Sequence, residues 1–232
     1  MSPNLTRKLL PIFFMFLSGV VNAQSAFEGF YSQIGAAYES NKIGSDSYTE
    51  QGLSLTQNST SSNSARVSFS AGYNHMFDSQ TLVGVGVEYY SIAPKMTATN
   101  SGCPSGCNDK LEYSLKDRFS IFLTPSLVKG NNALIYGKIG FSRQSGTATI
   151  RQIVPTDGND GYSGSGSVNG YVLGVGYKQM IDEGMYYFGE MNYYGYSGYD
   201  QNGTTPNGNQ PSNLYPKPTA FNAIIGLGYK FK

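Results

Sequence analysis

The sequence predicts an all-β protein, an eight-stranded antiparallel up-and-down β-barrel that crosses a membrane. Its 232 residues include 29 Gly and 19 Tyr, and only 13% of them are charged. Helix-favouring Ala, Leu, Glu and Lys are scarce, whereas Ser, Thr, Asn, Gly and Tyr are plentiful. This composition argues against a helical bundle, a coiled coil and an α/β enzyme. The rest of the prediction depends on two patterns. Eight segments alternate between apolar and polar residues, and the connections between the segments alternate between long and short.

The first 23 residues have the pattern of a secretory signal peptide. Arg7 and Lys8 precede an apolar run over 9–21, which is too short for a membrane-spanning helix, and small residues lead to a cleavage site near Ala23. We expect a mature domain of residues 24–232. Removing the two basic residues leaves 14 basic against 15 acidic residues, a net charge of −1. Such a domain has no basic excess with which to hold nucleic acid.

Eight segments alternate with a period of two residues, which is the pattern of strands with two different faces. In the last segment, for example, Phe221, Ile225 and Leu227 occupy one parity, and Asn222 and Gly228 occupy the other. We expect the apolar parity to face outward and the small or polar parity to face inward. The segments are 28–39, 65–77, 81–92, 111–127, 133–143, 168–179, 185–197 and 219–231.

The connections between the segments alternate strictly between long and short. The long ones cover roughly 40–64, 93–110, 144–167 and 198–218, and the short ones cover 78–80, 128–132 and 181–184. This one-sided arrangement is typical of a barrel in a bacterial outer membrane, with tight periplasmic turns and long external loops. We therefore expect both termini in the periplasm and four external loops.

Aromatic residues on the outward parity form two groups, one for each rim of the membrane. Phe30 and Tyr38 of the first segment lie eight residues apart, which is about 20 Å along a tilted strand and close to the height of an apolar membrane band. The group near the long loops is Tyr38, Tyr89, Tyr113, Phe141, Tyr171, Tyr193 and Phe221. The group near the short turns is Phe30, Tyr73, Tyr177, Tyr187, Tyr229 and Phe231.

Charged residues on the inward parity predict an ion-pair network in the lumen. An eight-stranded barrel is just wide enough for its own side chains, so charges that face each other inside it must pair. The network can be a structural core, or it can be a gate that opens a narrow water path by re-pairing. Its expected members are Glu88, Lys116, Arg118, Lys138 and Glu190.

Other reactive residues give little support to catalysis or metal binding. Three residues separate Cys103 and Cys107 in one long loop, and in an oxidising compartment we expect these two cysteines to form a disulfide. His75 is the only histidine, and its position beside a short turn favours a structural role at the membrane interface over a catalytic one. Asp157 to Gly161 lacks the spacing of a calcium loop and is expected to form a turn. No metal or cofactor is predicted.

The two ends of the barrel region resemble those of small bacterial outer-membrane proteins. Gly226-Leu227-Gly228-Tyr229-Lys230-Phe231 is similar to the C-terminal assembly signal of such barrels, in which Leu227, Tyr229 and Phe231 would be recognised, although Lys232 follows the Phe here. Glu28 to Gly35 resembles the first strand of the opacity-type, porin-family and outer-membrane protein A- or X-like barrels. The resemblance covers about residues 27–231 and implies contact with the barrel-assembly machinery during biogenesis.

In that broad family, eight-stranded barrels serve as structural proteins, adhesins, serum-resistance factors or very small pores, and a few relatives modify lipid A. We expect this chain to be a non-enzymatic outer-membrane protein with a structural or adhesin-like role. Its partners would be outer-membrane lipid, lipopolysaccharide and a surface ligand that the sequence does not name. A narrow porin is the alternative, and a lipid A-modifying enzyme is a more distant one.

Overall fold

The computed structural model describes residues 25–50, 53–91, 95–101, 110–130, 132–151, 162–198 and 217–231. Within these ranges the chain forms eleven β-strands and no helix. The strands are β1 (Gly29–Ile43), β2 (Asp46–Glu50), β3 (Leu53–Gln57), β4 (Thr60–Met76), β5 (Thr81–Ser91), β6 (Lys95–Ser101), β7 (Lys110–Lys129), β8 (Ala133–Arg151), β9 (Tyr162–Met180), β10 (Met185–Tyr196) and β11 (Pro218–Lys230).

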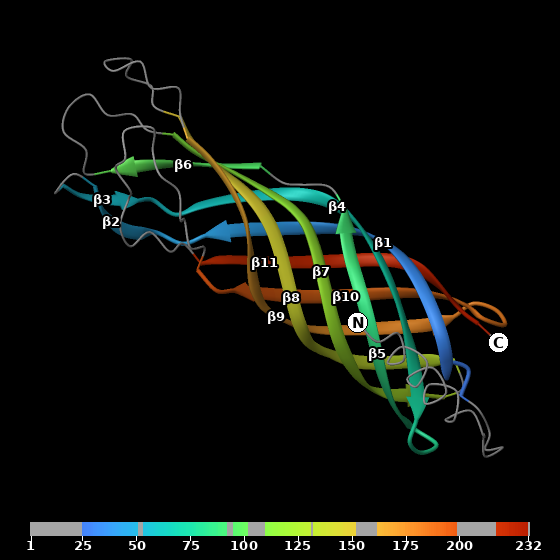
Figure 1. Cartoon of the computed structure of the whole chain (residues 1–232). Coiled ribbons are helices and arrows are strands. Elements are labelled where there is room, and N and C mark those ends of the chain that lie inside the picture. The colour runs from blue at the N-terminus through green and yellow to red at the C-terminus, as the bar shows by residue number, and fades with distance from the viewer. Residues whose placement is uncertain are drawn as a thin grey trace, which may run out of the picture.

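Eight of these strands close into an antiparallel barrel (Figure 1). The order around the barrel is β1, β4, β5, β7, β8, β9, β10 and β11, so each barrel strand pairs with its neighbours along the chain. The first and last strands close the ring, in a register that runs from Tyr31 opposite Lys230 to Ile43 opposite Pro218. Each of the eight predicted segments overlaps one of these strands, and the predicted up-and-down barrel is confirmed.

The short turns and the two ends of the barrel chain lie at one end of the molecule. The start of β1 pairs with the end of β11, and the backbone N–H of Lys230 donates to the carbonyl of Gly184 in the β9–β10 turn. In the β4–β5 turn, Asp78 Oδ1 accepts hydrogen bonds from the backbone N–H groups of Gln80 and Thr81, at 2.8 and 2.9 Å. These bonds, that from Gln80 foremost, lower the pKa of Asp78. Tight turns of this kind fix the register of the flanking strands.

The two faces of the barrel wall follow the predicted parity over most of its length. On β11, Ile225 is 73% exposed on the outer surface, whereas its neighbour Ile224 is 3% exposed in the interior. Inward glycines make room for large inward side chains on the neighbouring strand. A Cβ added to Gly176 or Gly228 would lie 2.2 Å from the ring of Tyr136 or Tyr186. The interior is therefore filled by side chains, as expected of eight strands.

The regions expected to be long polar loops are partly strand, which corrects the prediction for 40–64, 93–110 and 144–167. The pairing of β8 with β9 extends to Ile150 opposite Tyr162, and β2, β3 and β6 form a further antiparallel ladder beyond β7. Hydroxyl side chains meet across these extensions, as in Thr147 Oγ1 to Ser165 Oγ at 3.0 Å. A high content of Ser and Thr suggests loops, yet these residues also form cross-strand hydrogen-bonded pairs in solvent-exposed strands. Figure 1 shows these extensions at the end opposite the short turns.

A β-bulge in β7 corrects the predicted orientation of its outer half. The register with β8 shifts between Leu115 and Arg118, so that Lys116 and Asp117 are both exposed. Beyond the bulge the parity is reversed, and Tyr113 and Leu115 are buried. Lys116 therefore lies outside the lumen and Tyr113 does not belong to the outer aromatic rim, contrary to both predictions. A bulge inserts one residue into a strand, which strict alternation along the sequence cannot represent.

Candidate functional site: a charged lumen between two apolar layers

The outer part of the lumen holds one carboxylate between two guanidinium groups. Glu39 Oε1 accepts hydrogen bonds from Arg66 Nη1 at 3.0 Å and from Arg118 Nη2 at 3.1 Å, and Arg118 Nη1 also donates to Glu39 Oε2. All three side chains are fully buried. Arg118 Nε donates to Gln144 Oε1 at 2.9 Å. This cluster, the outer triad, comes from β1, β4 and β7 and carries one excess positive charge.

The inner part of the lumen holds the opposite arrangement, one ammonium group between two carboxylates. Lys138 Nζ donates to Glu88 Oε1 and to Glu190 Oε1, each at 2.9 Å. Glu190 also accepts hydrogen bonds from Tyr136 Oη at 2.7 Å and Asn192 Nδ2 at 2.6 Å. The charged side chains are at most 3% exposed. This inner triad comes from β5, β8 and β10 and carries one excess negative charge.

Two tyrosines and one asparagine join the triads into a continuous network. Tyr194 Oη donates to Glu88 Oε1 and hydrogen-bonds Tyr90 Oη, each at 3.1 Å. Asn222 Nδ2 donates to the same Tyr90 hydroxyl at 3.1 Å and to Glu39 Oε2 at 3.2 Å. Because the triads have opposite excess charges, they compensate each other through this bridge.

Lys178 adds a cation on the short-turn side of the inner triad. Its Nζ lies 4.2 Å from the centre of the Tyr31 ring, 5.1 Å from that of Tyr186 and 5.2 Å from that of Tyr136. The side chain is buried, and three aromatic faces therefore solvate its charge.

Clusters of buried apolar side chains flank this network at both ends of the barrel. At the short-turn end, Phe27 enters the barrel ahead of β1 and is buried together with Leu82 and Leu134. Asn74 Nδ2 holds the carbonyl of Phe27 at 2.9 Å. At the other end, a second cluster contains Ile43, Met96, Ala98, Tyr113 and Leu115, all buried. The charged side chains between these two clusters are almost fully buried.

The structure brings together four of the five residues that were expected to form the network. Glu88, Arg118, Lys138 and Glu190 are buried in the lumen, whereas Lys116 is on the outer surface. Glu39 and Arg66 were not expected in the network. Both stand on the inward parity, but at the outer ends of their predicted segments, where we had expected the membrane span to stop.

The remaining predicted residues lie elsewhere. Cys103, Cys107, residues 1–23 and the 157–161 turn are outside the described residues. Leu227, Tyr229 and Phe231 are exposed on the outer wall. His75 is exposed near the short turns, with its Nδ1 3.8 Å from Glu28 Oε1. In the described ranges no group of three or more His, Cys, Asp or Glu residues could hold a metal ion.

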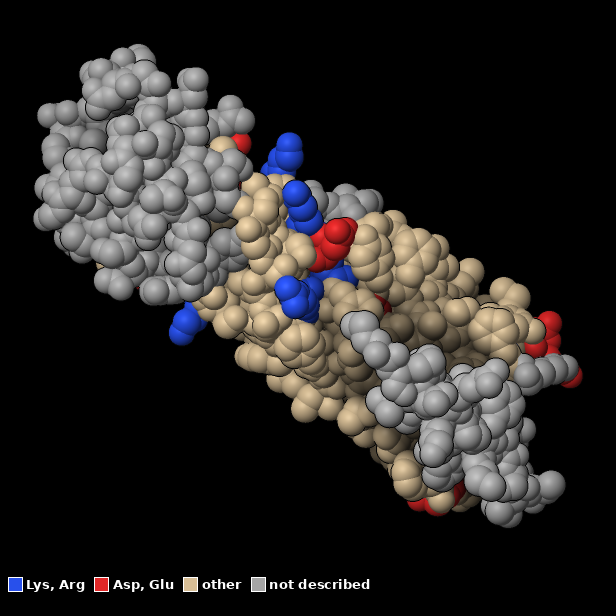
Figure 2. Space-filling model, viewed as in Figure 1, with Lys and Arg blue, Asp and Glu red and all other residues tan. Residues whose placement is uncertain are grey.

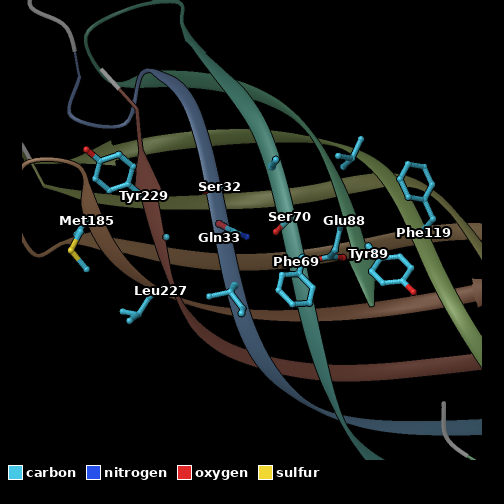
Figure 3. Close-up of a pocket in the computed structure, with 14 residues that line it drawn as sticks. Ser32, Gln33, Phe69, Ser70, Glu88, Tyr89, Phe119, Met185, Leu227 and Tyr229 are labelled. Carbon is cyan, nitrogen blue, oxygen red and sulfur yellow. The ribbon is translucent and has the colours of Figure 1, made fainter. Parts of the chain in front are cut away.

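The outer wall carries a hollow of about 550 Å³ over β1, β4, β5 and β11 (Figure 3). Its floor includes Ser32 and Ala71, which pair directly across β1 and β4 and have small side chains. Phe69, Leu227 and Tyr229 surround it and give it an apolar lining. Lipid chains cover apolar surfaces of this kind in membrane barrels.

The closed ring, the apolar outer wall and the polar lumen define the protein as an eight-stranded β-barrel of the outer-membrane type. Solved structures of bacterial outer-membrane proteins share the fold. Pseudomonas aeruginosa OprG is 14% identical (TM-score 0.50), and the match covers 90% of this chain and 99% of OprG. The outer-membrane protease OmpT of Escherichia coli is 10% identical (TM-score 0.51), with 91% and 99% covered.

Ail, the attachment invasion locus protein of Yersinia pestis, solved in complex with the heparin analogue sucrose octasulfate, is 16% identical (TM-score 0.42), with 88% of this chain and 99% of Ail covered. No protein-family model matches the chain, and no curated protein matches its sequence. At these identities the likeness defines the fold alone.

Proposed function

We propose that the chain is a non-enzymatic outer-membrane protein with a closed lumen, whose external strands and loops meet partners at the cell surface. The observation that carries this proposal is the buried charge network of the lumen. Six charged side chains, those of the two triads, are buried and paired between two apolar layers. An ion that crossed the barrel would have to displace both layers and break these pairs, each of which is costly to leave unpaired.

The external extensions support a role in surface interaction. Strand pairing continues beyond the barrel wall on β1, β4, β7, β8 and β9, and β2, β3 and β6 add a ladder at the same end. Paired strands hold their side chains in fixed positions, which gives a partner a defined surface to bind. The short-turn end has no comparable structure in the described part of the chain.

The arrangement of the lumen gives less support to the alternatives. A narrow pore is favoured by the continuous polar network, which could pass ions if it re-paired, but the apolar layers would also have to open. Catalysis by a Ser-His type of mechanism would require His75, the chain's one histidine, which is exposed near the short turns.

Planar-bilayer recordings of the purified full chain test the closed lumen. We expect no discrete conductance steps, because the network and both apolar layers block the path. Reproducible ion-conducting steps would refute the closed lumen and favour the pore.

Binding to whole cells and matrix proteins tests the surface role. Deleting the hairpin over 46–57 should lower binding, whereas replacing the β9–β10 turn over 181–184 should not. Both variants should still migrate faster unboiled than boiled on a detergent gel, which reports a folded barrel. Equal binding by both folded variants and the unmodified chain would contradict a role for this hairpin.

We also propose that the leader is removed near Ala23 and that Leu227, Tyr229 and Phe231 guide assembly of the barrel. Leu227 and Tyr229 are exposed on β11 and Phe231 directly after it, which supports recognition by the assembly machinery. Replacing Phe231 by Ala should reduce the amount of barrel in the outer membrane, measured by gel migration of isolated envelopes. Replacing the outward Phe221 at the other end of β11 serves as the matched control.

A further inference from the structure

Basic side chains gather around the outer end of the barrel wall (Figure 2). Arg143 follows Phe141 by two residues on β8, and Lys116 precedes Phe119 by three residues on β7. Both aromatic residues are exposed on the outer wall. These offsets place the two charges about 5 to 8 Å beyond the aromatic residues, given the rise of a tilted strand. That is the depth at which lipid headgroups meet the protein.

The β7 bulge turns Lys116 outward, between two further basic residues, Lys95 on β6 and Arg143 on β8. Lys95 pairs across β6 and β7 with Ser114, so Lys116 is its diagonal neighbour on the same face, at a Cα distance of about 7 to 8 Å. On the other side Arg143 pairs with Phe119, three residues from Lys116. All three basic side chains are exposed. Without the bulge Lys116 would face the lumen, so the extra residue is what completes this bulge cluster of Lys95, Lys116 and Arg143.

Asp117 is the acidic residue at the bulge. Its Oδ1 accepts a hydrogen bond from the Tyr89 hydroxyl at 2.6 Å, which holds the carboxylate against β5. Glu112 is the other diagonal neighbour of Lys95 on the same face. The bulge cluster therefore has three basic groups against two carboxylates and keeps one excess positive charge. Figure 2 shows acidic atoms next to the basic ones at this end.

The outward charges have opposite signs at the two ends of the barrel. Among residues whose side chains the structure describes, the outer end carries five basic and three acidic residues, namely Lys42, Lys95, Lys116, Arg143 and Lys217 with Asp46, Glu112 and Asp117. The short-turn end carries four acidic and two basic residues, namely Glu28, Asp78, Asp182 and Glu183 with Lys129 and Lys230. Within the described part of the chain the basic excess thus lies at the outer end, which suits a membrane whose outer leaflet carries anionic headgroups.

We propose that the bulge cluster binds the phosphate groups of an outer-leaflet glycolipid. Exposed ammonium and guanidinium groups at headgroup depth, next to aromatic side chains and an apolar wall, can contact the phosphorylated sugar while the acyl chains lie along the barrel. Arg143 can bind a phosphate through two N–H groups, and the two lysines add point charges. The inference does not depend on what the external loops bind or on whether the lumen conducts.

Lipid retention by the folded full chain tests this site. The probes are bisphosphorylated lipid A and the same lipid without its phosphates, each added to the detergent-solubilised barrel and measured by native mass spectrometry. We expect the phosphorylated lipid to bind about tenfold more tightly, which is the combined effect of three exposed charge contacts. The K95Q/K116Q/R143Q variant should lose this preference. The K129Q/K230Q variant, which removes basic residues from the other end, should keep it.

Three results would overturn the proposal. One is equal binding of the two lipids by the unmodified chain. Another is an unchanged preference in the K95Q/K116Q/R143Q variant, provided that gel migration shows it folded. The third is that the K95Q/K116Q/R143Q variant keeps its lipid preference but loses binding of a soluble heparin-derived oligosaccharide. The bulge cluster would then be a polysaccharide site. The conductance and cell-binding experiments above have separate readouts, so their failure is distinguishable from failure here.

Discussion

Replacing Glu39 by Gln should destabilise the barrel more than the same change at Glu190. In the outer triad, Glu39 is the one carboxylate paired with Arg66 and Arg118, and all three side chains are fully buried. Gln keeps the shape but removes the charge, which leaves two buried guanidinium groups without a carboxylate. Breaking a buried pair in this way costs about 3 to 5 kcal/mol.

The inner triad should respond differently, because Lys138 has a second carboxylate. After Glu190→Gln, Lys138 Nζ still contacts both oxygens of Glu88, at 2.9 and 3.0 Å. The loss is then close to that of weakened hydrogen bonds to a charged group, about 1.5 to 3 kcal/mol. The network thus predicts that the two chemically identical substitutions rank in a definite order.

Urea titrations of folding into lipid vesicles, followed by gel migration, measure this difference. With a slope of about 2 kcal/mol/M, a loss of about 4 kcal/mol lowers the unfolding midpoint by about 2 M for Glu39→Gln. The Glu190→Gln midpoint should fall by about half as much. If Glu190→Gln were the more damaging change, or if both were neutral, the assignment of charges to the two triads would be wrong.

Two further substitutions test the wall and its packing. Val175→Arg places a charge on the apolar wall between Tyr171 and Tyr177 and should cost about 2 to 4 kcal/mol in the same titration, whereas Val175→Ala should cost less than about 1 kcal/mol. Gly228→Ala places a Cβ 2.2 Å from the Tyr186 ring, and overpacking of this kind should cost about 1 to 3 kcal/mol. Gly189→Ala, whose nearest atom lies 3.9 Å away, is the matched control, and equal effects at both glycines would contradict this account of the interior.

The sequence was sufficient to predict the barrel because membrane strands obey a strict physical rule. Lipid requires an apolar outer parity and a narrow lumen requires small or paired inner residues, so alternation, loop lengths and aromatic rims all indicate one architecture. The same rule placed Glu88, Lys138 and Glu190 inside. It also applied to Glu39, but a carboxylate at the end of a segment gives no sign in the sequence of which arginines it meets across the barrel.

The errors lie where the rule stops. Beyond the membrane rim, water satisfies polar side chains on either face, so Ser- and Thr-rich strands such as the outer part of β8 have the composition of loops. The bulge falls on Lys116 and Asp117, two consecutive charged residues, and nothing in the alternation specifies which of them is the extra one. One inserted residue was enough to place Lys116 and Tyr113 each on the opposite face of the barrel wall from the one predicted.

The distribution of the two triads over the strands has a consequence for the order of folding. The outer triad joins β1, β4 and β7, and the inner triad joins β5, β8 and β10, so the two sets interleave along the chain. An intermediate that contains β5 but lacks β8 exposes Glu88 to the membrane interior without its partner Lys138. An intermediate that lacks β10 also lacks Glu190, so Lys138 is paired with Glu88 alone. Partly inserted barrels are therefore penalised, and we expect the strands to enter the bilayer in a single cooperative step rather than hairpin by hairpin.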